Sequence, residues 1–105
     1  MPSYTPPLRD MQFVMHEVLS VADEYKAMPR YAEVDADTIN AVLEEAGKFA
    51  ANVTFPLNIS GDEEGCTLDK ATHEVTAPKG FKEAYAQYVE GGWPALSCDP
   101  AYGGQ

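Results

Sequence analysis

Basic residues are scarce in this sequence. Of its 105 residues, 7 are Lys or Arg and 17 are Asp or Glu, so the formal net charge at pH 7 is −10. Surfaces that bind nucleic acid or anionic membranes gather Lys and Arg into patches. The shortage of positive charge therefore argues against both as partners, and we expect no nucleic-acid binding.

Long apolar runs and paired cysteines are also lacking. No stretch has the roughly 18 consecutive apolar residues that a membrane-spanning helix needs, and the first residues lack a basic stretch followed by an apolar one. The two cysteines, Cys66 and Cys98, are too few for a disulfide framework. These absences predict no membrane span and a cytoplasmic protein with reduced thiols.

Metal-binding spacings are missing as well. Four residues could in principle bind a metal: His16, Cys66, His73 and Cys98. No two of them stand as close in the sequence as the ligand pairs of structural zinc sites usually do. Asp35 and Asp37 resemble the start of a calcium loop. That loop would need glycine at its sixth position and an acidic residue at its twelfth, where Asn40 and Ala46 stand. We expect no metal site.

Catalytic patterns are equally hard to find. No Ser or Cys stands in a recognisable nucleophile context, and Gly103-Gly104 is not followed by a helix that could cradle a phosphate. The acidic run Asp62-Glu63-Glu64 is typical of a solvated turn. We therefore predict no catalytic, cofactor-binding or metal-binding residue within the chain.

A helical repeat of apolar residues is what the sequence does contain. Steps of three and four predict helices at roughly 8–26, 36–60 and 78–91, and hence an all-α fold of about three helices. A short β-hairpin is possible near 66–76. The expected apolar stripes are Leu8, Met11, Val14, Met15, Val18, Ala22 and Tyr25; Ile39, Val42, Leu43, Ala46, Phe49, Ala50, Val53 and Leu57; and Phe81, Ala84, Tyr85, Tyr88 and Val89.

Helix ends are marked by capping and breaking residues. Asp35 or Asp37 is expected to cap the second helix, and Pro29 to stop the first. Pro56 should kink or end the second helix, because its ring crowds the carbonyl four residues earlier. Gly91-Gly92 should end the third helix, after which Trp93 can fold back on its last turn.

The final residues, Ala101-Tyr102-Gly103-Gly104-Gln105, allow three interpretations. A Gly-Gly ending is used in conjugation tags, and Gly-Gly-Gln is the active loop of peptide-release factors. The acidic charge argues against an approach to RNA, and the helical repeat argues against a ubiquitin-like fold. We interpret the segment as a flexible connection that would continue in a longer chain.

Four stretches resemble the amino-terminal region of the acyl-CoA dehydrogenase family, in a bacterial subgroup with an amino-terminal extension. They occur in the family's order and together span nearly the whole chain: Tyr4–Val14, Phe55–Asp62, Pro78–Tyr85 with Gly91–Pro94, and Asp99–Gln105.

This resemblance implies a much longer, FAD-dependent parent enzyme that oxidises an acyl-CoA to the trans-2-enoyl-CoA. In the family a glutamate removes the α proton, a hydride passes to FAD, and the electrons leave to an electron-transfer flavoprotein. The glutamate and most flavin contacts belong to domains that this chain does not match. The chain itself is thus expected to be structural and inactive, with no flavin bound.

The resemblance also implies a division into an extension helix at 1–34 and the start of the family's helical domain at 35–105. Faces that the parent would cover should then be exposed, and self-association as a homo-oligomer is expected. The candidate exposed side chains are Phe13, Val21, Phe55, Ile59, Trp93 and Leu96. The alternative is a small acidic helical domain that binds other proteins and has no enzymatic activity.

Overall fold

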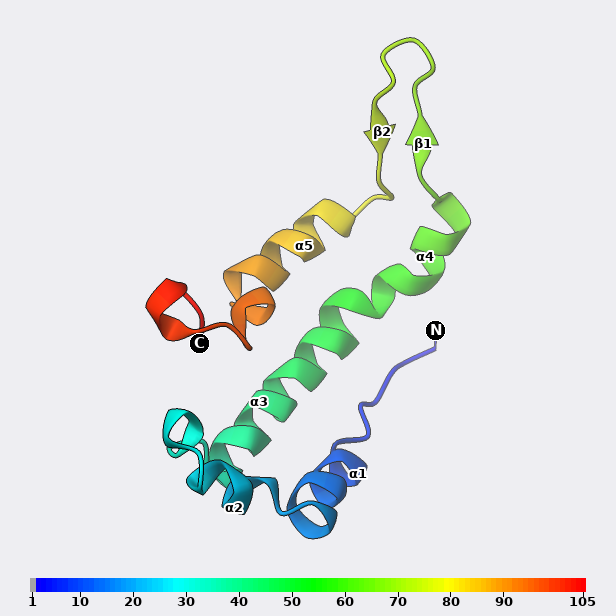
Figure 1. Cartoon of the computed structure of the whole chain (residues 1–105). Helices are drawn as coiled ribbons and strands as arrows, with labels where there is room; N and C mark the ends of the chain where they lie inside the picture. Colours follow the sequence, from blue (N-terminus) through cyan, green and yellow to red (C-terminus); the bar gives the residue numbers. More distant parts are fainter. Residues whose placement is uncertain (1) are drawn as a thin grey trace. The chain divides into compact units, whose positions relative to one another are not determined.

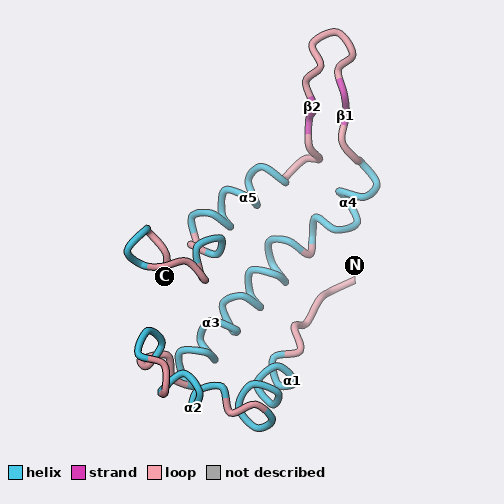
Figure 2. Tube along the Cα trace, viewed as in Figure 1, coloured by secondary structure: helices cyan, strands magenta, loops and turns pink. Residues whose placement is uncertain are grey.

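The computed structural model describes residues 2–105, which form a succession of helices with one short β-hairpin (Figure 1). The predicted all-α class is confirmed, and helix predominates along the trace (Figure 2). The chain divides into two compact units, unit 1 ending at Phe55 and unit 2 comprising Pro56–Gln105. The predicted division into an extension helix at 1–34 and the start of the family's helical domain at 35–105 stays a prediction.

The single helix predicted at 8–26 is wrong, because the structure interrupts it. Helix α1 (Leu8–Gln12) runs into a π-helical turn at Phe13–Val18, and a separate helix α2 (Val21–Lys26) follows. Between them Ser20 has a left-handed backbone, with φ 49° and ψ 49°. Left-handed backbone is unfavourable for a residue with a Cβ, and a helix cannot continue through it.

Helix α3 (Ala36–Phe49) begins where the sequence predicts. Asp35 is its N-cap, and the carboxylate of Asp35 accepts a hydrogen bond of 2.8 Å from the backbone N–H of Thr38. This bond satisfies one of the free N–H groups of the first turn. On the exposed side Lys48 pairs with Glu45 at 3.1 Å and with Glu44 at 3.9 Å.

The second helix ends near Phe55, which is one of the two outcomes predicted for Pro56. A π-helical turn at Ala50–Thr54 precedes it, closed by a 2.8 Å hydrogen bond from the Phe55 N–H to the Ala50 carbonyl. A π turn widens the ladder, so it gives room to a proline ring that would otherwise press on the preceding turn. Helix α4 (Pro56–Glu64) then begins with this proline.

Unit 1 packs along α3. Ile39 is its buried aliphatic side chain, only 6% exposed. The arm before α1 lies against the same helix, since a Cβ on Gly47 would come within 3.1 Å of Pro6. Near the other end of the arm, the rings of Tyr4 and Phe55 stack with their centroids 5.8 Å apart.

In unit 2 the solvated turn expected at Asp62-Glu63-Glu64 is wrong, since α4 remains helical through Glu64. The helix ends at Gly65, which has φ 67°. Ser60 bonds back to the Pro56 carbonyl at 3.4 Å. The acidic run Asp62-Glu63-Glu64 thus forms the last turn of a helix and is not a loop.

The predicted hairpin is confirmed. Strand β1 (Thr67–Leu68) pairs antiparallel with β2 (Val75–Thr76), with Thr67 opposite Thr76. The hairpin extends from the ends of α4 and α5 (Figure 1). The Asp69 carboxylate accepts hydrogen bonds from the N–H groups of Ala71 and Thr72, so the connecting loop is ordered by its own side chains.

Helix α5 (Phe81–Glu90) packs on α4 through glycines. A Cβ on Gly61 would come within 2.5 Å of the Phe81 ring, and one on Gly80 within 2.8 Å of Leu57. The N-cap Gly80 also has φ 92°, which only glycine adopts without strain. The side chains of Phe81 and Leu57 therefore occupy the space that a Cβ on Gly61 or Gly80 would take, and this lets the backbones of α4 and α5 approach closely.

The last residues fold back on the residues that follow α5, and the expected flexible connection to a longer chain stays a prediction. Gly91 and Gly92 end α5 as predicted, and Trp93 lies beside Gly91. Asp99 caps a short 3-10 turn at Pro100–Tyr102. The Gln105 N–H then donates a 3.1 Å hydrogen bond to the Ala95 carbonyl.

Exposure of apolar side chains follows the prediction in part. Phe13, Ile59 and Leu96 are exposed as expected. Val21, Phe55 and Trp93 are half-buried, so the prediction is wrong for these three. Phe55 is shielded by the stack with Tyr4, and Trp93 by its fold back onto the end of α5. No helix within residues 2–105 has the length and apolarity needed to cross a membrane.

Candidate functional site

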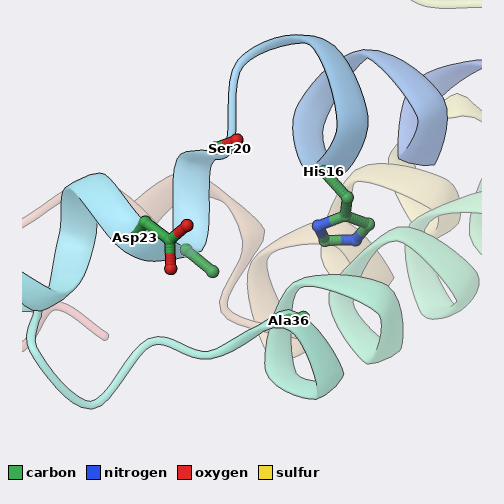
Figure 3. Close-up of a pocket in the computed structure, with 5 residues that line it drawn as sticks. His16, Ser20, Asp23 and Ala36 are labelled. Atoms are coloured by element: carbon green, nitrogen blue, oxygen red, sulfur yellow. The ribbon is translucent and has the colours of Figure 1, made fainter.

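A small hollow in unit 1 is the candidate site. It has a volume of about 170 Å³ and lies where α2 meets the start of α3. Figure 3 shows His16 projecting from the π-helical turn, Asp23 on α2 and Ala36 on α3. The lining residues are His16, Ser20, Ala22, Asp23 and Ala36.

His16 is held by a specific hydrogen bond. Its Nε2 donates to the side-chain carbonyl oxygen Oδ1 of Asn40 at 2.7 Å, and both side chains are half-buried. The bond joins residues 24 positions apart and ties the π-helical turn to α3. Its first effect is structural, because it fixes the orientation of the turn against the long helix.

The other polar side chains of the hollow form no catalytic constellation with His16. Ser20 has a left-handed backbone conformation, and its backbone carbonyl accepts hydrogen bonds from the N–H groups of Asp23 and Glu24. A nucleophile needs an adjacent base within hydrogen-bond reach. The imidazole of His16 is engaged with Asn40 instead.

The hollow does not fit a flavin or an acyl-CoA. Pockets for ligands of that size usually enclose about 300–1,000 Å³, and this one is smaller, with no glycine-rich turn among its lining residues. This hollow is therefore smaller than a pocket for FAD or an acyl-CoA would be. The absence of candidate catalytic and cofactor-binding residues remains an expectation from the sequence.

The four side chains of ligand type do not assemble. Within residues 2–105 no group of three or more His, Cys, Asp or Glu side chains could hold a metal ion. His16 bonds to Asn40, and His73 belongs to the hairpin loop, where its φ is 65°. Cys66 and Cys98 are exposed free thiols.

The two charged groups whose pKa values are shifted, Asp35 and Lys48, both stabilise helix α3. Hydrogen bonds from Thr38, first its backbone N–H, lower the pKa of Asp35, because they stabilise the carboxylate. The hydrogen bond and charge of Glu45 raise the pKa of Lys48. Asp35 is thus a cap; Asp37 belongs to the first turn of α3 and is not part of a calcium loop.

Sequence reasoning missed the pairing of His16 with Asn40. The sequence presents His16 as a possible metal ligand or a solvated histidine on a helix, and Asn40 as a residue that breaks a calcium loop. The available signal was weak: both are polar residues that belong to helical stretches with apolar neighbours. Such a residue on the buried side of a helix usually has a hydrogen-bonding partner.

Comparison with known proteins gives two relatives that match almost the whole chain. A 3-methylmercaptopropionyl-CoA dehydrogenase of Ruegeria pomeroyi is 38% identical over 102 residues, 97% of this chain. A broad-specificity linear acyl-CoA dehydrogenase, FadE5, of Mycobacterium tuberculosis is 32% identical over 104 residues, 99% of this chain. The chain spans 17% of the length of each relative. No family model matches the sequence.

Proposed function

Because this chain belongs to the acyl-CoA dehydrogenase family, we propose that it is the amino-terminal part of an FAD-dependent enzyme that oxidises an acyl-CoA to the trans-2-enoyl-CoA. One observation carries the proposal. The chain is matched over 97% of its residues by a relative of which it spans only 17%. A match of that kind is expected of one region of a longer polypeptide.

Within that enzyme we assign this region a structural role. Its hollow is too small for the cofactor or the substrate, and its helices present apolar side chains to solvent. FAD supplies the hydride chemistry in enzymes of this class, and the protein around it must bind and enclose the cofactor. That enclosure belongs to the remainder of the polypeptide, which this region would support.

The partners follow from the same proposal. The substrate is an acyl-CoA, and the electrons leave to an electron-transfer flavoprotein. The exposed apolar side chains support assembly into a homo-oligomer, since extended apolar surface rarely stays open to water. A cytoplasmic location fits the two free thiols.

The test is to express the full open reading frame that encodes this chain. The purified protein should carry bound flavin, visible in its absorbance, and the flavin should bleach when an acyl-CoA is added. A series of linear acyl-CoA thioesters and 3-methylmercaptopropionyl-CoA, the compound in one relative's name, would define the substrate class. A protein without bound flavin, or one whose flavin is bleached by none of these thioesters, contradicts the proposal.

The second candidate is a small acidic interaction domain without enzymatic activity. The observation in its favour is the row of exposed large side chains on α5, which has the spacing of a helix that docks in a groove: Phe81, Tyr85, Tyr88 and Val89. It predicts an open reading frame that ends with this chain. Light scattering would then show a stable monomer.

A further inference from the structure

The arm before α1, residues 2–7, is a proline-rich segment without helix or strand that runs beside α3 (Figure 1). Half of its residues are proline: Pro2, Pro6 and Pro7. A proline has a fixed φ and no N–H, so a segment of this composition is already restricted to extended forms. It therefore loses little conformational entropy when it binds to a surface.

Two side-chain contacts hold the arm on the long helix. Pro6 fills the space beside Gly47, where a Cβ would come within 3.1 Å of its Cγ and 3.4 Å of its Cβ. The ring of Tyr4 stacks on Phe55 with 5.8 Å between the centroids and 27° between the planes. The carbonyl of Pro6 accepts a hydrogen bond within its own segment, and among residues 2–105 no hydrogen bond joins the arm to α3.

Gly47 gives α3 a notch for this segment. Glycine is an unfavourable residue in the interior of a helix, where alanine is preferred. Here Gly47 is buried, and the three atoms nearest to the position of its missing Cβ belong to Pro6 and Leu8. The space that this glycine leaves open is thus filled by the arm and by the first residue of α1.

The spacing of the two contacts sets a direction and a register. Gly47 and Phe55 are eight residues apart, which is about 12 Å along a helix. Tyr4 and Pro6 are two residues apart, about 6 Å of extended chain, and the length of the tyrosine side chain covers the rest. The arm runs antiparallel to α3, with its tyrosine toward the carboxyl end of the helix. A tyrosine and a proline with one residue between them fit this arrangement.

We propose that Gly47 and Phe55 form a binding site for an extended Tyr-x-Pro segment, and that the arm is its exchangeable occupant. Proline-rich segments commonly dock against aromatic side chains in this way. Tyr4 is 40% exposed, so the arm lies at the surface and can leave without breaking a hydrogen bond to α3. The proposal goes beyond the proposed function and does not depend on flavin chemistry.

A peptide in trans tests the site in the full-length protein. Residues 2–6 are deleted, and a fluorescently labelled peptide of residues 2–8 is titrated with the intact and with the arm-deleted protein while its anisotropy is measured. We expect the arm-deleted protein to bind the peptide at least about tenfold more tightly, because the tethered arm no longer competes at its millimolar effective concentration.

Two variants of the peptide are matched controls. The Tyr4→Ala peptide should bind the arm-deleted protein about tenfold more weakly, because it loses the stack on Phe55. The Tyr4→Phe peptide keeps the ring and should bind as the original peptide does.

Gly47→Ala tests the notch, with and without the arm. In the arm-deleted protein the new Cβ meets no proline ring, and alanine favours the helix. Hydrogen exchange in peptides from α3 should therefore become slower, while affinity for the labelled peptide falls about tenfold because the notch is filled. In the intact protein the same substitution should release the arm, so that hydrogen exchange at Tyr4 and Thr5 becomes faster.

Three outcomes would overturn the proposal. The first is an absence of saturable binding to the arm-deleted protein up to about 1 mM peptide. The second is equal binding of the original and Tyr4→Ala peptides. The third is an affinity of the intact protein for the peptide that rises on dilution, which would mean that the arm of a second copy fills the site. Flavin absorbance is measured on the same samples, and its absence would contradict the proposed function alone.

Discussion

Unit 1 and unit 2 hold their helices together in different ways. In unit 1 side chains from distant parts of the sequence meet along α3 and the π turn after it: Ile39 is buried, His16 bonds to Asn40, and Tyr4 stacks on Phe55. In unit 2 neighbouring elements approach through glycines, with Gly61 against Phe81 and Gly80 against Leu57. Unit 1 should therefore be sensitive to the loss of side chains, and unit 2 to the addition of a Cβ.

The largest expected effect is that of truncating the buried isoleucine of unit 1. Ile39→Ala should lower the free energy of unfolding by about 3–4 kcal/mol, through lost burial and a residual cavity. Ile59 of unit 2 is 51% exposed and provides the matched control. Ile59→Ala should change the same quantity by about 0.5 kcal/mol or less. Urea titration followed by circular dichroism measures both, and equal effects would contradict the contrast.

A Cβ added in unit 2 comes next in size. Gly80→Ala meets both a φ of 92° and the side chain of Leu57, and should destabilise by about 2–3 kcal/mol. Gly65→Ala meets a φ of 67° but no atom within 4 Å, and should cost about 1–2 kcal/mol. The difference between the two variants isolates the contact with Leu57. Hydrogen exchange rates of peptides from α4 and α5 would measure the difference in stability between the two variants.

The hydrogen bond that ties the π-helical turn to α3 should contribute less. His16→Ala, Asn40→Ala and the double variant form a cycle whose coupling energy we expect to be about 1 kcal/mol. Faster hydrogen exchange in residues 13–18 of each single variant would accompany it. If the two single effects are additive, so that the coupling energy is near zero, the hydrogen bond does not stabilise unit 1.

The smallest effect belongs to the cap of α3 and depends on pH. The pKa of Asp35 is below its ordinary value of 3.8 in the folded chain, so the carboxylate's contribution to stability is complete above that value. It is lost as the pH falls through the lower, folded-state pKa. Asp35→Asn should therefore flatten the acid limb of a plot of melting temperature against pH. Asp37→Asn, with no cap bond, should leave that limb unchanged.

The sequence allowed prediction of those features that depend on near neighbours. The Asp35 cap, the hairpin and the Gly91-Gly92 ending were all predicted and are confirmed, because each depends on a few adjacent residues. The break at Ser20 was not predicted, since serine seldom adopts a left-handed backbone. Val18, which the sequence places on the apolar stripe, is 59% exposed, and this was missed for a related reason. An apolar stripe assumes 3.6 residues per turn, and a π turn changes that spacing without a clear mark in the sequence.

The candidate site was harder to predict than the fold. The partnership of His16 with Asn40 joins positions 24 apart, and no local pattern encodes it. The family resemblance implied chemistry at residues that no position of this chain matches. It could therefore not indicate what the hollow beside His16 does.

The two π-helical turns, at Phe13–Val18 and Ala50–Thr54, have a consequence for how related sequences align. A π turn is equivalent to one residue inserted into an α-helix without breaking it. Relatives that lack the turn should show a single-residue gap at these places. For the first turn, the register of every later apolar position up to Ser20 would shift with that gap. Such gaps inside a helix mark where the side chains change the face they present.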